Sequence, residues 1–245
     1  MAGGDGTVEK VLTALGPSST TAAIIPTGSA NNIAKAIGVT MDDPESVIAG
    51  WGTADHRRFD VWQIGGTWGR SRFLEAFGGG VFANMFKRAD ARRDEPSGAE
   101  KLDRGLQLLR SELEHVDPEP WELEIDGRQV SEQFLGVEMM NVSHLGPQLE
   151  LARDADPADG VLDIVLLRPG DREDLIAHLN AHLAGGAVPI SGLEVLRGSR
   201  IVAATRAGSR LHVDDEFPAE GGESEQRAEV RLAEVDVELL VPRPS

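Results

Sequence analysis

The chain has 245 residues, of which 40% are hydrophobic, and it carries a formal net charge of −17 with no cysteine. That length and apolar content are enough to bury the core of one large domain or two small ones. The charge argues against nucleic acid as a partner and against tight electrostatic adhesion to anionic membranes. The lack of cysteine excludes disulfides and thiolate metal sites. Because no stretch resembles a signal peptide or a membrane span, we expect a cytoplasmic protein.

The first element in the chain is a glycine-rich loop followed by a helix. Gly3, Gly4 and Gly6 occur in the stretch Gly-Gly-Asp-Gly-Thr, and apolar residues at helical spacing predict a helix that ends near Leu15. Glycine lets backbone N–H groups converge on an anion, and the positive N-terminal end of a helix adds to that attraction. The stretch therefore fits a phosphate-binding loop, although an ordinary tight turn explains the same residues.

A second loop of this kind follows a short apolar strand. The sequence predicts the strand over Ala22–Ile25, then a turn that ends at Gly28, a helix over Ser29–Ile37 and a further helix over Asp42–Trp51. Strands that alternate with helices favour a parallel sheet, so we expect residues 1–56 to form an α/β domain. The start of the Ser29–Ile37 helix is a second candidate anion site. The alternative is a plain turn in which Ser29 caps the helix.

From residue 57 onward the pattern is mainly that of short strands. Two helices interrupt it, over Lys101–His115 and Asp171–Leu183, and Asp126-Gly127 marks a hairpin. We expect an antiparallel β-sandwich over residues 57–233, with a return to the first domain over about 234–245. The predicted strands are Phe59–Ile64, Phe73–Phe77, Trp121–Ile125, Phe134–Val142, Leu162–Leu167, Leu193–Ala203, Leu211–Val213 and Val230–Leu240.

The acidic run Asp214, Asp215 and Glu216 follows one of the predicted strands. A carboxylate whose pKa is raised by burial or by a nearby like charge can accept a proton as a general base. The alternative is an acidic hairpin turn at the end of a solvated strand, and the run alone does not decide between them.

A second acidic stretch, with Asp159, Gly160 and Asp163, precedes the strand over Leu162–Leu167. Carboxylate and backbone oxygens are the ligands that Mg²⁺ prefers, but a plain turn before the strand explains the same residues.

His178 and His182 lie one helical turn apart, a spacing that suits zinc. Position 179 is leucine where a metalloprotease carries glutamate, and no third ligand is evident, so we expect a solvated helix edge instead.

Taken in order, four stretches resemble the diacylglycerol kinase catalytic family, the bacterial lipid kinases related to sphingosine kinases. They are Gly3–Thr7, Ile24–Val39, Asp154–Leu167 and Val213–Glu216, and they span most of the chain. The resemblance implies a truncated α/β nucleotide-binding domain, an antiparallel β-sandwich domain that binds lipid, and a cleft between the two. It also implies an ATP-dependent lipid kinase, which uses Mg²⁺ and transfers the γ-phosphoryl group to the hydroxyl of a lipid alcohol such as diacylglycerol.

The same resemblance assigns roles to single residues. Asp214 would be the general base with Glu216 beside it, Asp5 would face Mg·ATP as a catalytic residue and metal ligand, and Asp159 would hold a structural Mg²⁺. The glycine strand Gly78–Gly80 would line the lipid cleft. The nucleotide would be bound by Gly3, Gly4, Gly6, Thr7, Gly28, Ser29 and Asn31.

The chain also departs from the family pattern. Asn32 stands where the family commonly has aspartate, Asp215 where it has glycine, and Glu9-Lys10 where it usually has Asn-Glu. The stretch that ordinarily precedes the first glycine loop is missing, and the strand edges this exposes would favour a homodimer. The alternative to a kinase is a non-catalytic lipid-binding module or an inactive fragment. Expected partners are a lipid alcohol and, in brief contact, a membrane surface.

Overall fold

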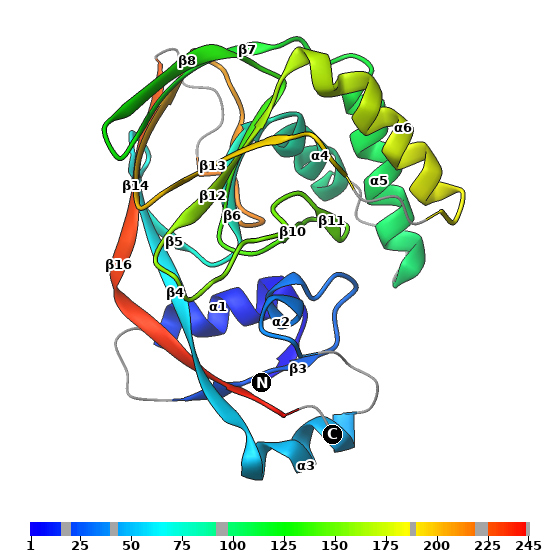
Figure 1. Ribbon diagram of the computed structural model, residues 1–245, viewed down its shortest axis with the longest axis vertical. Helices are drawn as coiled ribbons and strands as arrows, with labels where there is room; N and C mark the ends of the chain where they lie inside the picture. The colour runs from blue at the N-terminus through cyan, green and yellow to red at the C-terminus, as the bar shows by residue number, and fades with distance from the viewer. Residues whose placement is uncertain (16–20, 40–43, 92–97, 187–189, 219–224, 244–245) are drawn as a thin grey trace.

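The structure is a computed structural model, and it describes residues 1–15, 21–39, 44–91, 98–186, 190–218 and 225–243. Two β-sheets face each other in the upper part of Figure 1, with three helices against one of them. A smaller α/β part lies below. Both termini lie in that lower part, because the last strand returns to the start of the chain.

The α/β part is built on two very short strands and two helices that flank the glycine loops. Strand β1 (Ala2–Gly3) pairs in parallel with β3 (Ile25–Pro26), which confirms the expected parallel arrangement. Helix α1 (Asp5–Leu15) begins inside the first loop, and α2 (Asn32–Ala36) follows the second. Helix α3 (Pro44–Gly50) and a 3₁₀ turn, η1 (Trp51–Thr53), lead to the sandwich, while residues 42 and 43 of the predicted helix lie outside the described residues.

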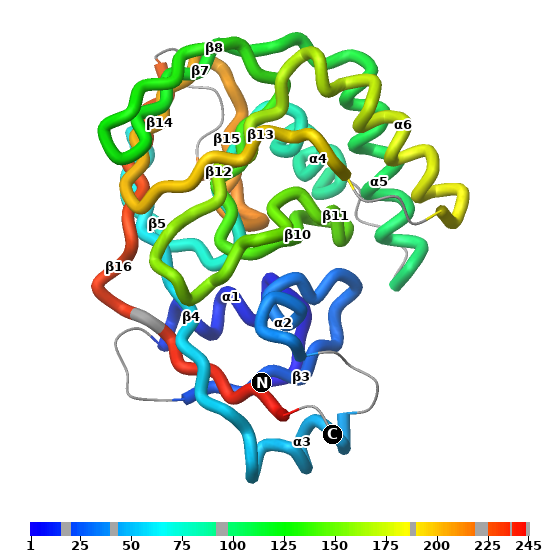
Figure 2. Tube along the Cα trace, in the orientation of Figure 1, coloured from blue at the N-terminus to red at the C-terminus, as the bar shows by residue number. Residues whose placement is uncertain are grey.

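The larger sheet has seven strands and joins the two parts of the molecule. Its longest strands, β4 and β16, run antiparallel from the sandwich down into the α/β part, where β2 pairs in parallel with β16 (Figure 2). Continuous strands therefore cross the expected domain boundary, which stays a prediction. In order, the sheet comprises β5 (Gly69–Phe73), β4 (Asp55–Gly66), β16 (Gln226–Val241), β14 (Arg200–Thr205), β7 (Glu119–Ile125) and β8 (Arg128–Phe134), with β2 (Ala22–Ala23) off this path.

The second sheet has five antiparallel strands, and its inner face packs against the seven-stranded sheet. The shared core includes Trp62, Phe77, Trp121 and Phe134, all at most 1% exposed. The antiparallel sandwich predicted from the sequence is confirmed. The strands, in order, are β13 (Glu194–Gly198), β12 (Leu162–Leu167), β9 (Gly136–Met140), β6 (Ala76–Gly80) and β15 (Leu211–Val213).

Helices cover the outer face of the five-stranded sheet. All six residues of β12 are buried, because apolar layers lie on both sides of it. The covering elements are α4 (Val81–Asp90), α5 (Ala99–Leu113), η2 (Pro169–Asp171) and α6 (Arg172–Leu183), and the small hairpin of β10 (His144–Leu145) and β11 (Leu149–Glu150) packs nearby. Within the described ranges, no helix is both long and apolar enough to cross a bilayer.

Five predicted elements need correction. The strand over Phe73–Phe77 is broken, because Phe73 ends β5 in one sheet whereas Ala76 begins β6 in the other. Three other predicted strands divide between sheets in the same way: Ala22–Ile25 between β2 and β3, Phe134–Val142 between β8 and β9, and Leu193–Ala203 between β13 and β14. The helix expected over Ser29–Ile37 is only the five-residue α2, since Asn31 takes a left-handed φ of 54° and the helix begins after it.

Candidate active site

A cleft of about 860 Å³ lies between the α/β part and the helices α4 and α5. Its α/β wall carries both glycine loops, and its far wall carries the apolar side chains Met85, Phe86, Leu102, Leu108 and Leu145. Positive charge reaches the same space from Lys10, Lys101 and Arg104. The cleft can therefore take a ligand with an anionic end and an apolar end.

The two glycine loops touch each other at their backbones. A Cβ on Gly4 would lie 2.9 Å from the Cα of Gly28, and a Cβ on Gly28 would collide with the Cα of Gly4. Only glycine fits at either position. Gly3 is also required, since a Cβ there would lie 2.6 Å from the Cβ of Thr7, and the N–H of Thr7 donates to the carbonyl of Gly4 over 3.0 Å.

Asn31 and Ser29 shape the second loop through their side chains. The Asn31 amide accepts a hydrogen bond from the Gly28 N–H at 2.9 Å and donates to the Gly28 carbonyl at 2.7 Å. Ser29 does not cap α2 as the plain-turn alternative required, because its hydroxyl accepts a bond from the N–H of Gly98 at 3.2 Å. Direct nucleotide contacts from these residues stay a prediction, whereas their hydrogen bonds within the protein hold the shape of the loop.

Asp5 links the first loop to α2 and to a carboxyl group that the sequence analysis missed. One Asp5 oxygen accepts the N–H of Ile33 at 3.1 Å, and the Asp5 and Glu75 carboxyl groups are hydrogen-bonded to each other. Burial, and then the charges of Asp5 and Asp214, raise the pKa of Glu75 well above its ordinary value. Glu75 lies in the short break between β5 and β6, where the pattern suggested only an unbroken strand.

Asp214 lies at the base of the cleft and is only 6% exposed. Its carboxylate accepts three backbone N–H bonds, from Leu74 at 2.9 Å, Glu75 at 2.8 Å and Ala76 at 3.0 Å. Burial raises its pKa to about 6, although those three bonds oppose the shift. A rigidly held carboxylate that is ionised near pH 7 but basic for its type has the properties of a general base.

The other residues of the acidic run are arranged differently. Asp215 and Glu216 are exposed, and Asp215 faces the first glycine loop, with one carboxylate oxygen 2.9 Å from where a Cβ of Gly6 would stand. The residue with a positive φ is Asp214, at 48°, so a side chain at position 215 causes no backbone strain. Glu9 is buried against this run, and burial, followed by the charges of Asp214 and its two neighbours, raises the pKa of Glu9 to about 8.

A buried ion pair contacts the backbone of the acidic run at Asp214. His212 and Glu138 are both fully buried, and the imidazole Nε2 lies 2.9 Å and 3.0 Å from the two carboxylate oxygens. The other ring nitrogen, Nδ1, lies 2.9 Å from the carbonyl oxygen of Asp214. Gly78 makes room for this pair, because a Cβ on Gly78 would overlap the Glu138 carboxyl. The glycine strand thus accommodates a buried carboxyl in the sheet; its predicted place along a lipid cleft stays untested.

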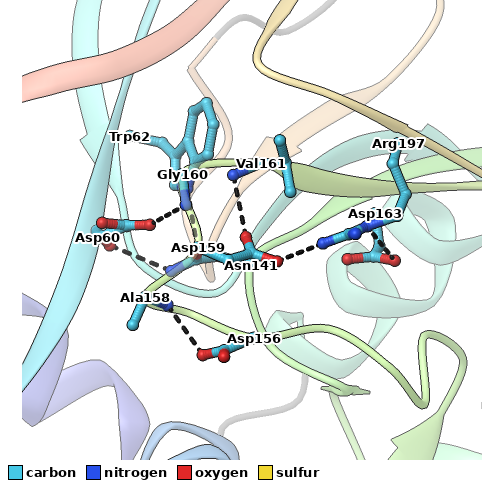
Figure 3. Close-up of polar contacts among 10 residues, drawn as sticks. All are labelled: Asp60, Trp62, Asn141, Asp156, Ala158, Asp159, Gly160, Val161, Asp163 and Arg197. Carbon is cyan, nitrogen blue, oxygen red and sulfur yellow. Dashed lines mark hydrogen bonds and ion pairs between the residues drawn. The ribbon is translucent and has the colours of Figure 1, made fainter.

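The acidic turn before β12 is shown in Figure 3. One Asp159 oxygen accepts the N–H of Val161 at 3.0 Å, and the other forms an ion pair with Arg197 of β13. Arg197 also lies 3.6 Å from Asp163, whose pKa burial raises to about 6 while Arg197 opposes the shift. The N–H of Gly160 donates to Asp60 at 2.7 Å. Asp159 as a metal ligand stays a prediction that this geometry does not favour, because both of its oxygens already have partners.

No group of three acidic or histidine side chains within the described ranges converges closely enough to bind a metal. The ring centroids of His178 and His182 are 6.4 Å apart on α6, and the interpretation of the two as a solvated helix edge stays a prediction. In the cleft, however, Glu75 Oε1 and Asn32 Oδ1 are buried oxygens without a hydrogen-bond partner. Such hard oxygen donors fit Mg²⁺ that is carried in by phosphates, since that ion takes one or two carboxylates and completes its shell from its substrate.

The fold and the cleft together define a class of protein. Its members have an α/β part with two glycine loops in contact, joined to an antiparallel β-sandwich. A model for the YegS C-terminal NAD kinase beta sandwich-like domain matches residues 79–235, and a model for the diacylglycerol kinase catalytic domain matches residues 1–64. The chain therefore belongs to the diacylglycerol kinase family with a C-terminal domain of the YegS type, as its motifs suggested.

Individual relatives agree with this membership. The chain is 25% identical over 224 residues to a diacylglycerol kinase of Bacillus subtilis (strain 168), covering 88% of this chain and 70% of that protein. It is 23% identical over 246 residues to a diacylglycerol kinase of Mycobacterium tuberculosis (strain H37Rv), covering 98% and 75%. Among solved structures, a diacylglycerol kinase from Bacillus anthracis (strain Sterne) aligns with a TM-score of 0.66 at 17% identity, over 99% of this chain and 75% of that one. Yeast NADH kinase complexed with NADH shares the fold more distantly, with a TM-score of 0.57 at 9% identity over 99% and 60%.

Proposed function

We propose that this protein is an ATP-dependent lipid kinase, which transfers the γ-phosphoryl group of ATP to the hydroxyl of a lipid alcohol such as diacylglycerol. The observation that carries the proposal is the composition of one cleft. At one end of the cleft, two glycine loops in backbone contact can bind an anionic ligand. At the other end, the cleft is lined by apolar side chains of α4 and α5. A nucleoside triphosphate and a lipid tail need those two environments side by side.

In this proposal the chain's own residues position the reactants and move one proton. The loops at Gly3–Thr7 and Gly28–Asn31 offer backbone N–H groups to the phosphates. The Asp214 carboxylate, held by three N–H donors, takes the proton of the attacking hydroxyl. Asp5 and Glu75 would hold Mg²⁺ delivered with ATP, and their shared hydrogen bond would give way to it. That ion supplies charge neutralisation for the phosphates during transfer.

The departures from the family pattern do not remove these parts. The amide of Asn32 keeps an acceptor oxygen in the cleft while its nitrogen donates to the Gly146 carbonyl at 3.1 Å. An amide cannot carry a negative charge, so the negative charge at this wall of the cleft comes from the hydrogen-bonded carboxyl pair of Asp5 and Glu75. Brief contact with a membrane surface and a homodimer are further parts of the proposal, and each rests on the sequence argument alone.

The test is transfer of labelled γ-phosphate from Mg·ATP to a panel of lipid alcohols. We expect label on one lipid class with the wild-type chain, and a loss of about 10²–10⁴-fold in the Asp214→Asn variant, the range for removal of a general base. Asp174→Asn, an exposed change on α6, is the matched control. Because Asp214 also holds backbone N–H groups, Asp5→Asn is tested too, since its amide oxygen keeps the bond to Ile33.

Folding of each variant is checked by its thermal melt. A folded wild-type chain that labels no lipid of the panel would count against the kinase and favour the alternative, a non-catalytic lipid-binding module or an inactive fragment. Transfer that survives in both folded aspartate variants would refute the roles given to these residues.

A further inference from the structure

The second glycine loop belongs to the α/β part, but its polar groups are held by the other part of the molecule. Gln148, in the turn between β10 and β11, donates from its side-chain nitrogen to the carbonyl of Ser29 at 3.0 Å and to that of Ala30 at 3.2 Å. The neighbouring carbonyl of Gly146 accepts the Asn32 amide at 3.1 Å. One short turn therefore makes three hydrogen bonds to the loop and the first residue of α2.

These bonds fix the direction of the loop's N–H groups. In a planar trans peptide the C=O and the N–H point in opposite directions. When Gln148 binds the carbonyls of Ser29 and Ala30, the N–H groups of Ala30 and Asn31 point away from it. Neither N–H has a hydrogen-bond partner in the part of the chain that the structure describes. Ser29 and Ala30 both line the cleft, where such N–H groups would meet an anion.

The turn that carries Gln148 is itself supported by the helices. A Cβ on Gly146 would lie 3.0 Å from the ring of Phe86, and a Cβ on Gly105 of α5 would lie 2.9 Å from Pro147. Figure 2 shows the β10–β11 hairpin between α2 below and α4 and α5 beside it. With Pro147 buried and Gly146 against Phe86, the turn is a fixed support and not a free loop end.

The backbone of Gln148 has an unfavourable conformation, and the hydrogen bonds of its side chain compensate for the conformational energy. Its φ is 61°, in the left-handed region that an L residue other than glycine, asparagine or aspartate seldom takes. Glycine would be the residue of choice if only the turn mattered. A long amide side chain at this position is explained by the two carbonyls it reaches.

We propose that Gln148 is a positioning residue, which holds the Ser29–Asn31 loop in its anion-binding shape from across the boundary between the two parts of the molecule. The loop is ordered only while the β10–β11 turn is docked against it. For nucleotide binding the inference rests on the proposed kinase function, whereas for the order of the loop it stands on the recorded contacts alone.

Two variants separate the side chain's role from the strain of the turn. Gln148→Glu keeps the size and the backbone but replaces the donor with an acceptor that faces two carbonyls. Gln148→Gly removes the donor and relieves the positive φ, so it is expected to fold at least as well as wild type. Gln133→Glu is the matched control, because this side chain is exposed on β8 and has no hydrogen-bond partner among the described residues.

The first measurement is amide hydrogen exchange of the bonded N–H groups of Gly28, Ile33 and Lys35, which flank the loop. We expect exchange about tenfold faster in both Gln148 variants, and unchanged in the control, as follows from losing two neutral hydrogen bonds. Unchanged exchange in a folded Gln148→Glu variant would overturn the proposal.

The second measurement is the affinity for Mg·ATP, with the steady-state constants where transfer is detected. The Kd and the KM for Mg·ATP are expected to rise about tenfold, with the KM for the lipid unchanged. An equal rise in both KM values would indicate a general structural defect and would count against a positioning role. If the wild-type chain binds no Mg·ATP, the kinase proposal fails, and the exchange measurement still decides whether Gln148 orders the loop.

Discussion

The buried pair of Glu138 and His212 offers the most direct test of how the acidic run is held in place. Both side chains are 0% exposed. Burial raises the pKa of Glu138 against the opposing charge of His212. Burial by itself would lower the pKa of His212, but the Glu138 carboxylate and the Asp214 carbonyl bring it above the ordinary value. The pair therefore holds its proton between two groups that have no access to water.

Removing one partner of such a pair leaves the other buried without compensation, at a cost of about 3–5 kcal/mol. We expect Glu138→Ala to lower the free energy of unfolding by that amount, a large share of the ~5–15 kcal/mol typical of a domain. Glu138→Gln keeps the shape and an acceptor oxygen but loses the charge, so we expect about 1.5–3 kcal/mol. Urea denaturation measures both. Glu122→Ala, an exposed glutamate on β7, is the control.

The reasoning would be refuted by a loss below about 1 kcal/mol for Glu138→Ala, because the His212 imidazole then either stays charged without a counter-ion or loses its proton and keeps a buried ring nitrogen unpaired, and either state costs more than that. A second readout follows the bond from His212 to the Asp214 carbonyl, 2.9 Å long. In the folded Glu138→Gln variant the amide of Asp214, which donates to Ala76 at 2.8 Å, should exchange faster. Unchanged exchange there would mean that the pair stabilises the sandwich without positioning the acidic run.

Two further predictions concern charged groups outside this pair. The pKa of Glu9 is raised by burial to about 8 from an ordinary 4.5, so its contribution to stability is complete below pH 4.5 and is lost as the pH rises through 8. Glu9→Gln should flatten that decline, by up to about 1.4 kcal/mol per pH unit, and parallel urea-stability profiles for the variant and wild type would contradict this. At the turn in Figure 3, Arg197→Ala should lower the thermal midpoint, and millimolar Mg²⁺ should restore it only in the variant, where Asp159 loses its counter-ion. A magnesium-dependent midpoint in nucleotide-free wild type would instead support Asp159 as a metal ligand.

Local patterns predicted the parts of the fold that local chemistry decides. The hairpin at Asp126-Gly127 forms as expected, with φ values of 47° and 87°, because those two residues tolerate left-handed conformations. The strand over Leu162–Leu167 is an unbroken apolar run and is buried along its whole length. In each case the sequence signal and the structural requirement lie within the same few residues.

Where a strand passes from one sheet to the other, the sequence carries no comparable signal. The run Phe73–Phe77 is apolar enough to continue, and it breaks because the Asp214 carboxylate, 139 residues further on, accepts the N–H of Glu75. Helix α4 was missed although Phe82, Met85, Phe86 and Ala89 recur at helical spacing, because the glycines just before it were interpreted as part of a longer strand. The helix packs on α5, and Phe82 lies against Gly136 of β9. Contacts made at long range decide the strand breaks, and no local pattern reports those.

The same distinction explains which site residues the sequence could supply. The glycine loops and the acidic run were found because their conformations demand particular residue types in a fixed order. Glu75 and Gln148 belong to no motif: Glu75 lines the cleft from the break between β5 and β6, and Gln148 donates hydrogen bonds to the second loop from the turn between β10 and β11. The cleft is thus assembled from two kinds of residue: those that make a loop able to bind an anion, and those that hold the loop where a second substrate can reach it. Residues of the second kind are recognised from their contacts across the boundary, which is why the structure was needed to find them.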